Sequence, residues 1–229
     1  MKKRLVICVL SAFLGMAVLW KGYEKLVDGF FLYRTTPPTA LPTLSPEPKF
    51  NAALNVCLNQ PFYYLASGSQ SFVFVSADHQ LILKLFKHYR WKAPFYASWL
   101  PSLTHYWTQK RLSGLLATYQ SCLFCWEEFK EDTALIYLQL TPSRGALLPV
   151  TLYNRLGKEY TLSLEETSFV LQKYAEPVAE RLLALKDQGD LIQAQVAIES
   201  LLNNVLNKRS RGFTDKDPNF LNNFGFVGN

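Results

Sequence analysis

The fold is decided by residues 62–86, which read FYYLASGSQSFVFVSADHQLILKLF. Apolar runs at 62–65, 72–75 and 81–86 are separated by two short breaks of small and polar residues. Aromatic and β-branched runs bounded by such breaks are typical of strands joined by tight turns. The sequence therefore predicts an antiparallel three-stranded meander, with Lys84 near the centre of its third strand.

Further periodic segments follow this meander along the chain. Apolar residues recur at helical spacing over residues 112–129, and two more strand-like runs cover 134–140 and 147–153. A capping box that begins at Ser163 predicts a helix to about Lys186 with a kink or break at Pro177, and Gly189-Asp190 predicts the start of another helix. We therefore expect an α+β fold, in which a five-stranded antiparallel sheet is followed by helices.

Composition excludes several classes of protein. The chain has 229 residues, of which 49% are hydrophobic and 18% charged, so one main folded domain is expected. Residues 1–25 carry five of the 24 Lys and Arg and one of the 18 Asp and Glu, which leaves a net charge of +2 for the remainder. Such a small excess predicts no nucleic-acid partner. Four Cys and three His without paired spacing predict neither a disulfide framework nor a metal site.

The N-terminus has the pattern of a membrane-engaging segment. Three basic residues precede an uncharged run of 16 residues from Leu5 to Trp20, and Lys21 ends it. This length lies between the apolar region of a signal peptide and a full membrane span. We expect residues 1–25 to form an uncleaved single-pass membrane anchor, which implies membrane localisation. A cleaved signal peptide and a buried core helix are the alternatives.

Residues 26–49 are expected to form a proline-rich linker. The segment 35–48 holds five of the chain's twelve prolines. Prolines at this density favour extended polyproline geometry, about 3.1 Å per residue, over helix or sheet. A spacer between the anchor and the folded domain is the interpretation that we favour over a ligand for a proline-recognition domain.

The segment 62–86 resembles the start of a protein-kinase-like small lobe, in which a strand, a loop, a strand and a third strand with a lysine follow one another. In kinases the glycine-rich loop closes over the nucleotide phosphates and the lysine pairs with them. The matching loop positions are Ala66, Gly68, Ser71 and Val73, and the matching lysine is Lys84. One of the three glycines is present.

A second segment, near the C-terminus, is similar to the kinase catalytic loop. Asp217 precedes Asn222 by five residues and Asn223 by six. In kinases the aspartate accepts the proton of the substrate hydroxyl, and the asparagine five residues later helps to hold magnesium. The segment also looks like a loop of uncharacterised kinase-like proteins of intracellular bacteria.

The two segments together imply a site and a domain organisation. Asp217 and Lys84 would be the catalytic residues; the cofactor-binding residues would be Ala66, Gly68, Ser71, Val73, Asn222 and Asn223. ATP and magnesium are the cofactors that the resemblance implies, and Glu127 or Glu128 would pair with the lysine. The small lobe would cover residues 50–158, and a partial helical lobe would cover 159–229.

The resemblance also implies that catalysis is incomplete. Kinases hold magnesium with a further aspartate downstream of the catalytic loop, and no Asp or Glu follows Asp217 in this sequence. We therefore expect a membrane-anchored, catalytically incomplete kinase-like domain that is at most nucleotide-binding or scaffolding. The alternatives are an active phosphotransferase completed by another chain, and a membrane-tethered interaction or structural protein unrelated to kinases.

Two remaining motifs are given structural interpretations. Cys122 and Cys125 lie inside a helical apolar run, so burial is expected rather than redox or metal chemistry. Residues 89–99 interleave aromatic and basic residues, a pattern that suits nucleic acid, a bilayer surface or burial against the domain. We favour burial. The expected partners are a membrane and, if the domain is a scaffold, another protein.

Overall fold

The computed structural model describes residues 2–38, 52–92, 99, 101–143, 147–212 and 224–228. Within these ranges the α-helices are α1 (Lys2–Leu26), α2 (Ala52–Leu58), α3 (Pro101–Glu128), α4 (Val178–Asp187) and α5 (Leu191–Ser210). The strands are β1 (Phe62–Ser67), β2 (Ser71–Ser76), β3 (Leu81–Phe86), β4 (Leu135–Gln139), β5 (Val150–Tyr153), β6 (Glu159–Leu162), β7 (Phe169–Lys173), β8 (Glu176–Pro177) and β9 (Gly225–Phe226). Two short 3₁₀ helices, η1 (Leu32–Thr35) and η2 (His88–Trp91), complete the set.

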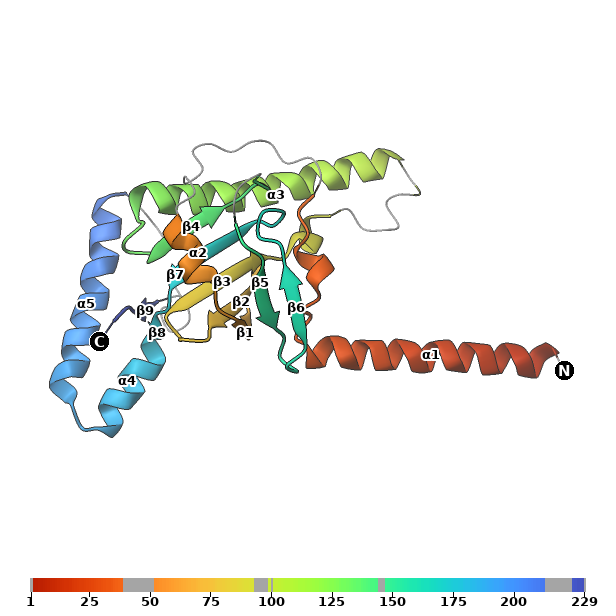
Figure 1. Cartoon of the computed structure of the whole chain (residues 1–229), viewed down its shortest axis with the longest axis horizontal. Helices are drawn as coiled ribbons and strands as arrows, with labels where there is room; N and C mark the ends of the chain where they lie inside the picture. Colours follow the sequence, from red (N-terminus) through yellow and green to blue (C-terminus); the bar gives the residue numbers. More distant parts are fainter. Residues whose placement is uncertain are drawn as a thin grey trace.

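A curled seven-stranded sheet forms the centre of the domain (Figure 1), with the strand order β4-β7-β3-β2-β1-β5-β6. The predicted meander is confirmed, since β1 pairs antiparallel with β2 and β2 with β3. The predicted five-stranded antiparallel sheet is wrong, because β1 pairs parallel with β5 and the β5–β6 hairpin extends the sheet beyond it. A parallel pair joins strands far apart in the chain, so the local pattern did not reveal it.

The helix predicted over 163–186 is also wrong in its first half. Residues 169–173 form β7, which lies between β3 and β4 and pairs antiparallel with both. Phe169 and Leu171 are fully buried there, and burial on both faces of a central strand favours a continuous apolar run. The helix begins only at Val178, directly after Pro177, where proline is well tolerated at a helix start.

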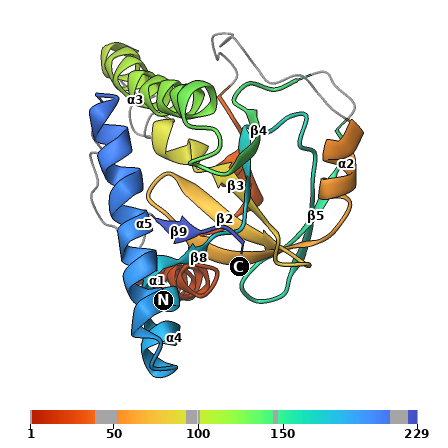
Figure 2. The same ribbon diagram turned by 90° about the vertical axis from the view of Figure 1, so that its left-hand side faces the viewer.

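Two apolar cores lie on opposite faces of the sheet. Helix α3 covers one face, where Leu115 and Tyr119 pack against Phe86 of β3 and against side chains of β4 and β7. The other face encloses the larger core, to which α2 contributes Leu54 and Leu58. Figure 2 shows α3 and α2 on different sides of the sheet. Because side chains alternate along β3, its odd-numbered leucines enter the larger core and Lys84 lies on the α3 side.

The segment that follows α1 packs into the domain. Phe30 is fully buried, and its ring meets those of Phe72 and Phe74 edge-on, at centroid distances of 5.3 and 5.0 Å. Val27 is also fully buried. Residues 27–35 therefore form part of the folded domain, whereas residues 39–49 of the predicted linker lie outside the described residues.

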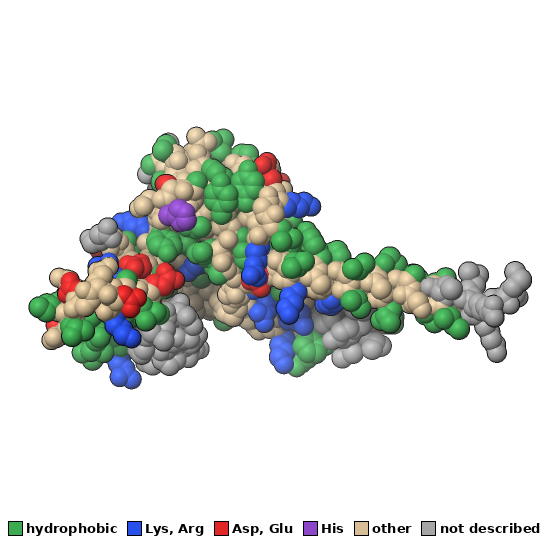
Figure 3. Space-filling view, turned by 90° about the horizontal axis from the view of Figure 1, so that it is seen from below, with side chains coloured by type: hydrophobic (Ala, Val, Ile, Leu, Met, Phe, Trp, Pro, Cys, Tyr) green, Lys and Arg blue, Asp and Glu red, His purple; other side chains and the backbone are tan. Residues whose placement is uncertain are grey.

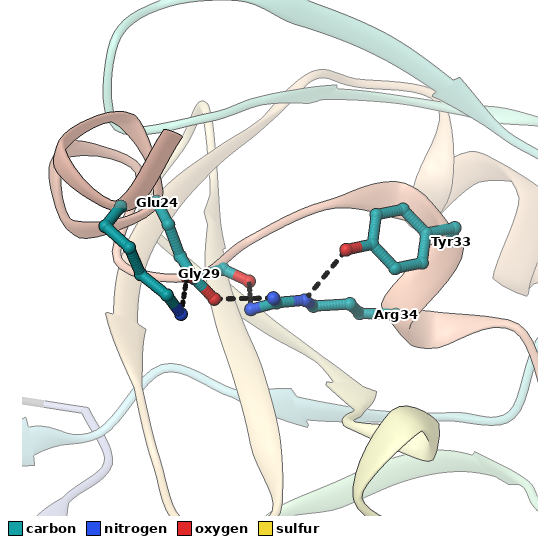
Figure 4. A network of polar contacts seen from close by, with 5 residues as sticks. Glu24, Gly29, Tyr33 and Arg34 are labelled. Atoms are coloured by element: carbon teal, nitrogen blue, oxygen red, sulfur yellow. Dashed lines mark hydrogen bonds and ion pairs between the residues drawn. The ribbon is translucent and has the colours of Figure 1, made fainter. Parts of the chain in front are cut away.

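Arg34 joins this segment to the end of α1 (Figure 4). Its guanidinium donates to Glu24 Oε1 at 2.5 Å, to the Gly29 carbonyl at 2.9 Å and to the Tyr33 hydroxyl at 3.3 Å. Lys21 Nζ also donates to Glu24, at 2.8 Å. The two cationic partners hold the pKa of the Glu24 carboxyl below its usual range. These contacts fix the direction in which α1 leaves the domain.

Helix α1 extends away from the rest of the molecule (Figure 1). No helix among the described residues is both long and apolar enough to cross a membrane. The uncharged run from Leu5 to Trp20 spans about 24 Å at a rise of about 1.5 Å per residue, which is short of the roughly 30 Å hydrocarbon core of a bilayer. This finding contradicts the predicted membrane anchor, and with it the transmembrane helix, the signal-anchor and the membrane localisation.

Helices α4 and α5 form a hairpin at the end of the molecule opposite α1 (Figure 1). Asp190 caps α5, as predicted, because its side chain accepts a hydrogen bond from the Gln193 backbone N–H at 3.0 Å. No residue of α5 is buried, and Leu191 and Ile192 are 72% and 77% exposed. The hairpin thus presents a large apolar surface.

Candidate functional site

Lys84 lies in β3, an inner strand of the sheet, as the pattern of residues 62–86 predicted. It pairs with Val73 of β2 on one side and with Val170 of β7 on the other. Its side chain therefore emerges from a central strand on the face that α3 covers. Of the predicted loop residues, Val73 is its direct cross-strand neighbour, and Ser71 pairs with Phe86 two residues further along β3.

The environment of Lys84 disfavours the charged form of its amine. Burial lowers the pKa of Lys84, and the nearby Cys122 thiol of α3 raises it to a smaller extent. Burial raises the pKa of that thiol to about 12, so the thiol is neutral at pH 7. Within the part of the chain that the structure describes, no carboxylate forms an ion pair with this amine. Burial of such an amine is costly, because desolvation penalises the ammonium form.

The carboxylates that the resemblance offered as partners lie elsewhere. Glu128 contacts Arg211 Nη2 at 3.2 Å, at the end of α3, and Glu127 is exposed. The lysine–glutamate pair of an active kinase is therefore not formed by Lys84 with either residue. Both glutamates lie at the C-terminal end of α3, which ends at Glu128. The α3 residue that affects the pKa of Lys84 is Cys122, which lies nearly two turns earlier on the helix.

The β1–β2 loop does not use the backbone freedom of glycine. Gly68 has no left-handed φ, and a Cβ built there would meet the Ser71 carbonyl oxygen at 3.5 Å, an ordinary contact. Its N–H donates to the same carbonyl at 2.9 Å, which closes a tight turn. Ala66, the next predicted loop position, pairs with Val73 after a bulge in β1. The loop is thus an ordinary hairpin turn in its backbone geometry.

Two cations that sequence reasoning missed hold this loop. Lys87 Nζ donates to Ser67 Oγ and to the Gly68 carbonyl, both at 2.5 Å, and it lies 4.7 Å from the centre of the Phe72 ring. Arg90 Nη1 donates to the Ser69 carbonyl at 2.5 Å. Hairpin pairing was the signal that could have found Lys87, because a residue just after β3 must lie beside the β1–β2 loop.

The other half of the predicted site cannot be compared with the structure. Asp217, Asn222 and Asn223 lie outside the described residues. The chain that follows them returns to the domain, where β9 pairs antiparallel with β8. The two cysteines of the helical motif lie in α3, as predicted, but they are half-buried rather than fully buried.

A shallow cavity is found away from Lys84. It has a volume of about 340 Å³ and is lined by residues of the β1, β5 and β6 region, among them Gln60, Thr151 and Glu159. None of the residues predicted for the site lines it. Among the described residues, no group of His, Cys, Asp and Glu side chains is arranged to hold a metal ion.

Comparison of the chain with protein-family models, with curated proteins and with solved structures found no match. The resemblance to kinases therefore depends on the residues of this chain alone.

Proposed function

We propose that this chain is a catalytically incomplete kinase-like domain that serves in nucleotide binding or as a scaffold. The proposal depends chiefly on Lys84, a buried amine on the third strand of a meander, beneath the helix that follows that strand. Kinases place the lysine that meets the nucleotide phosphates at this point of the fold. The order of β1, β2, β3, α3 and β4 along the chain supports the same interpretation.

Lys84 forms no ion pair with any residue that the structure describes, which suits ligand binding better than catalysis. An active kinase requires an ion pair between this lysine and a glutamate of the following helix. Here the helix offers a neutral thiol, and Glu128 is engaged with Arg211. A polyphosphate would supply the negative charge that the amine lacks, since an opposite charge nearby favours the ammonium form. We therefore expect nucleotide binding without efficient phosphoryl transfer.

Binding of a fluorescent ATP analogue to the full-length protein tests the proposal. We expect saturable binding that Lys84→Met weakens at least tenfold, because methionine keeps the packing and removes the charge. Lys173→Met is the matched control, since Lys173 is an exposed lysine on neighbouring β7 and should leave the affinity within about twofold. Absence of binding, or equal affinity of the Lys84 and Lys173 variants, would refute the proposed function.

A second candidate is an interaction or structural protein unrelated to kinases. The apolar surface of α5 favours it, because Leu191, Ile192 and Leu206 are all more than half exposed on a helix without buried residues. In that case the protein would bind no nucleotide. Substitution of Ile192 by Ser would weaken association with a protein partner, while Lys84→Met would leave that association unchanged.

A further inference from the structure

The charges of the chain are strongly separated along its sequence. Residues 79–126 contain six Lys and Arg and no Asp or Glu, whereas residues 159–199 contain eight Asp and Glu and three Lys and Arg. Figure 3 shows basic side chains gathered beside the base of α1, and acidic side chains at the opposite end, over α4 and α5. Residues 79–126 therefore carry a net charge of +6, which equals the net charge of the whole chain. The charges of all other residues cancel.

Four of these cations form one surface. Arg111 of α3 donates through Nη1 to the carbonyls of Arg90 and Lys92, at 3.2 and 2.5 Å, which joins α3 to η2. Lys110 lies beside Arg111 on α3, and both lie over the Trp107 ring, at 5.7 and 5.5 Å from its centre. We call Arg90, Lys92, Lys110 and Arg111 the η2–α3 basic surface.

The η2–α3 basic surface is accessible and its charge is not neutralised locally. Arg90, Lys92 and Lys110 are exposed, and Arg111 is half-buried. None of the four forms an ion pair within the part of the chain that the structure describes. The four side chains have the same charge and come from two elements that Arg111 joins, so an anionic partner would stabilise them.

Two aromatic rings of this region lie against cations of the same chain, whereas Trp99 is 79% exposed. Trp107 faces Lys110 and Arg111, and Tyr89 faces the Arg34 guanidinium at 4.7 Å. Proteins that bind single-stranded nucleic acid need ring faces on which bases can stack. Trp107 and Tyr89 instead position cationic heads, and positioned guanidinium groups are suited to carboxylates.

We propose that the η2–α3 basic surface binds an acidic segment of a partner protein, rich in Asp and Glu. Charge complementarity decides the chemistry of the occupant, and Arg90 and Arg111 provide its directional contacts. The surface does not involve Lys84, although Arg90 also donates to the Ser69 carbonyl of the β1–β2 loop. The proposal does not require nucleotide binding, and the lysines of the surface can be changed without removing that loop contact.

Fluorescence anisotropy with a labelled peptide of ten glutamates and the full-length protein tests this proposal. We expect binding that weakens steeply between 50 and 200 mM salt, because salt screens exposed charges. The double variant Arg90→Glu/Arg111→Glu should lose at least tenfold in affinity. Since Arg111 also contacts backbone carbonyls, Lys92→Glu/Lys110→Glu is a second test and should weaken binding in the same direction.

A control variant and two further measurements complete the test. Arg155→Glu/Lys158→Glu changes the same charge on the turn between β5 and β6 and should leave the affinity within about threefold. Equal losses in this control and the surface variants would overturn the proposal. So would tighter binding of a twenty-residue oligothymidylate at the same surface. Sedimentation showing salt-sensitive self-association, abolished by the surface variants, would also overturn it, because a second copy would then be the occupant.

Discussion

His88 is expected to make the stability of this domain depend on pH. The ring is fully buried; its Nδ1 lies 2.7 Å from the Thr35 carbonyl and its Nε2 lies 2.8 Å from the Tyr119 hydroxyl. One tautomer satisfies both contacts, with Nδ1–H donating to the carbonyl and Nε2 accepting from the hydroxyl. Burial, and to a smaller extent the nearby charge of Lys92, lower the pKa of His88 from 6.5 to about 4.

The lowered pKa of His88 determines whether stability rises or falls with pH. Between pH 6.5 and 4 the unfolded chain binds a proton at His88 that the folded protein does not bind, so the free energy of unfolding falls as the pH falls. The contribution is fully present above pH 6.5 and is lost by about pH 4. At about 1.4 kcal/mol for each pH unit, the pKa difference corresponds to roughly 3 kcal/mol.

Urea unfolding of the wild type and of His88→Gln, measured from pH 7.5 to 4, checks this prediction. The variant lacks the titrating group, so the difference in free energy of unfolding between the two proteins should shrink by roughly 3 kcal/mol toward pH 4. His105→Gln replaces an exposed histidine of α3 and should follow the wild-type profile. Parallel profiles for the wild type and His88→Gln would refute the reasoning, whatever the cost of the substitution at pH 7.

Three further substitutions test how the elements are held. Phe30→Ala should destabilise the domain by about 3–5 kcal/mol in denaturant unfolding, because it empties a fully buried site, whereas Phe13→Ala on exposed α1 should change stability by less than about 0.5 kcal/mol. Gly29→Ala should cost more than Gly189→Ala: both have a φ near +70°, but only at Gly29 would the new Cβ meet a guanidinium nitrogen, at 3.2 Å. Equal losses of stability at the two positions would show that the Arg34 guanidinium moves away from the new Cβ without a measurable free-energy penalty. Asp190→Ala should cost about 1 kcal/mol and reduce the helical circular dichroism signal, since it removes the cap of α5.

The strand positions of two residues of the candidate site could be placed from the sequence. Lys84 and Val73 were predicted on adjacent strands, and they are direct cross-strand partners. The cations that hold the β1–β2 loop were missed. Hairpin pairing could have placed Lys87 beside the loop, but the backbone carbonyls that Lys87 and Arg90 bind have no sequence signature. The expected pairing with Glu127 or Glu128 failed for a related reason, since Glu128 meets Arg211, a residue 83 positions away.

The amino-acid sequence by itself determined the elements whose signals are local. The meander over residues 62–86 follows from alternating apolar runs and tight turns, and the start of α5 follows from Gly189-Asp190. Only the tertiary structure decided that residues 169–173 are a strand, because a short apolar run has the same appearance in a buried strand and a buried helix. It also decided the parallel pairing of β1 with β5 and the burial of Phe30, since both depend on contacts between segments that are distant in the chain.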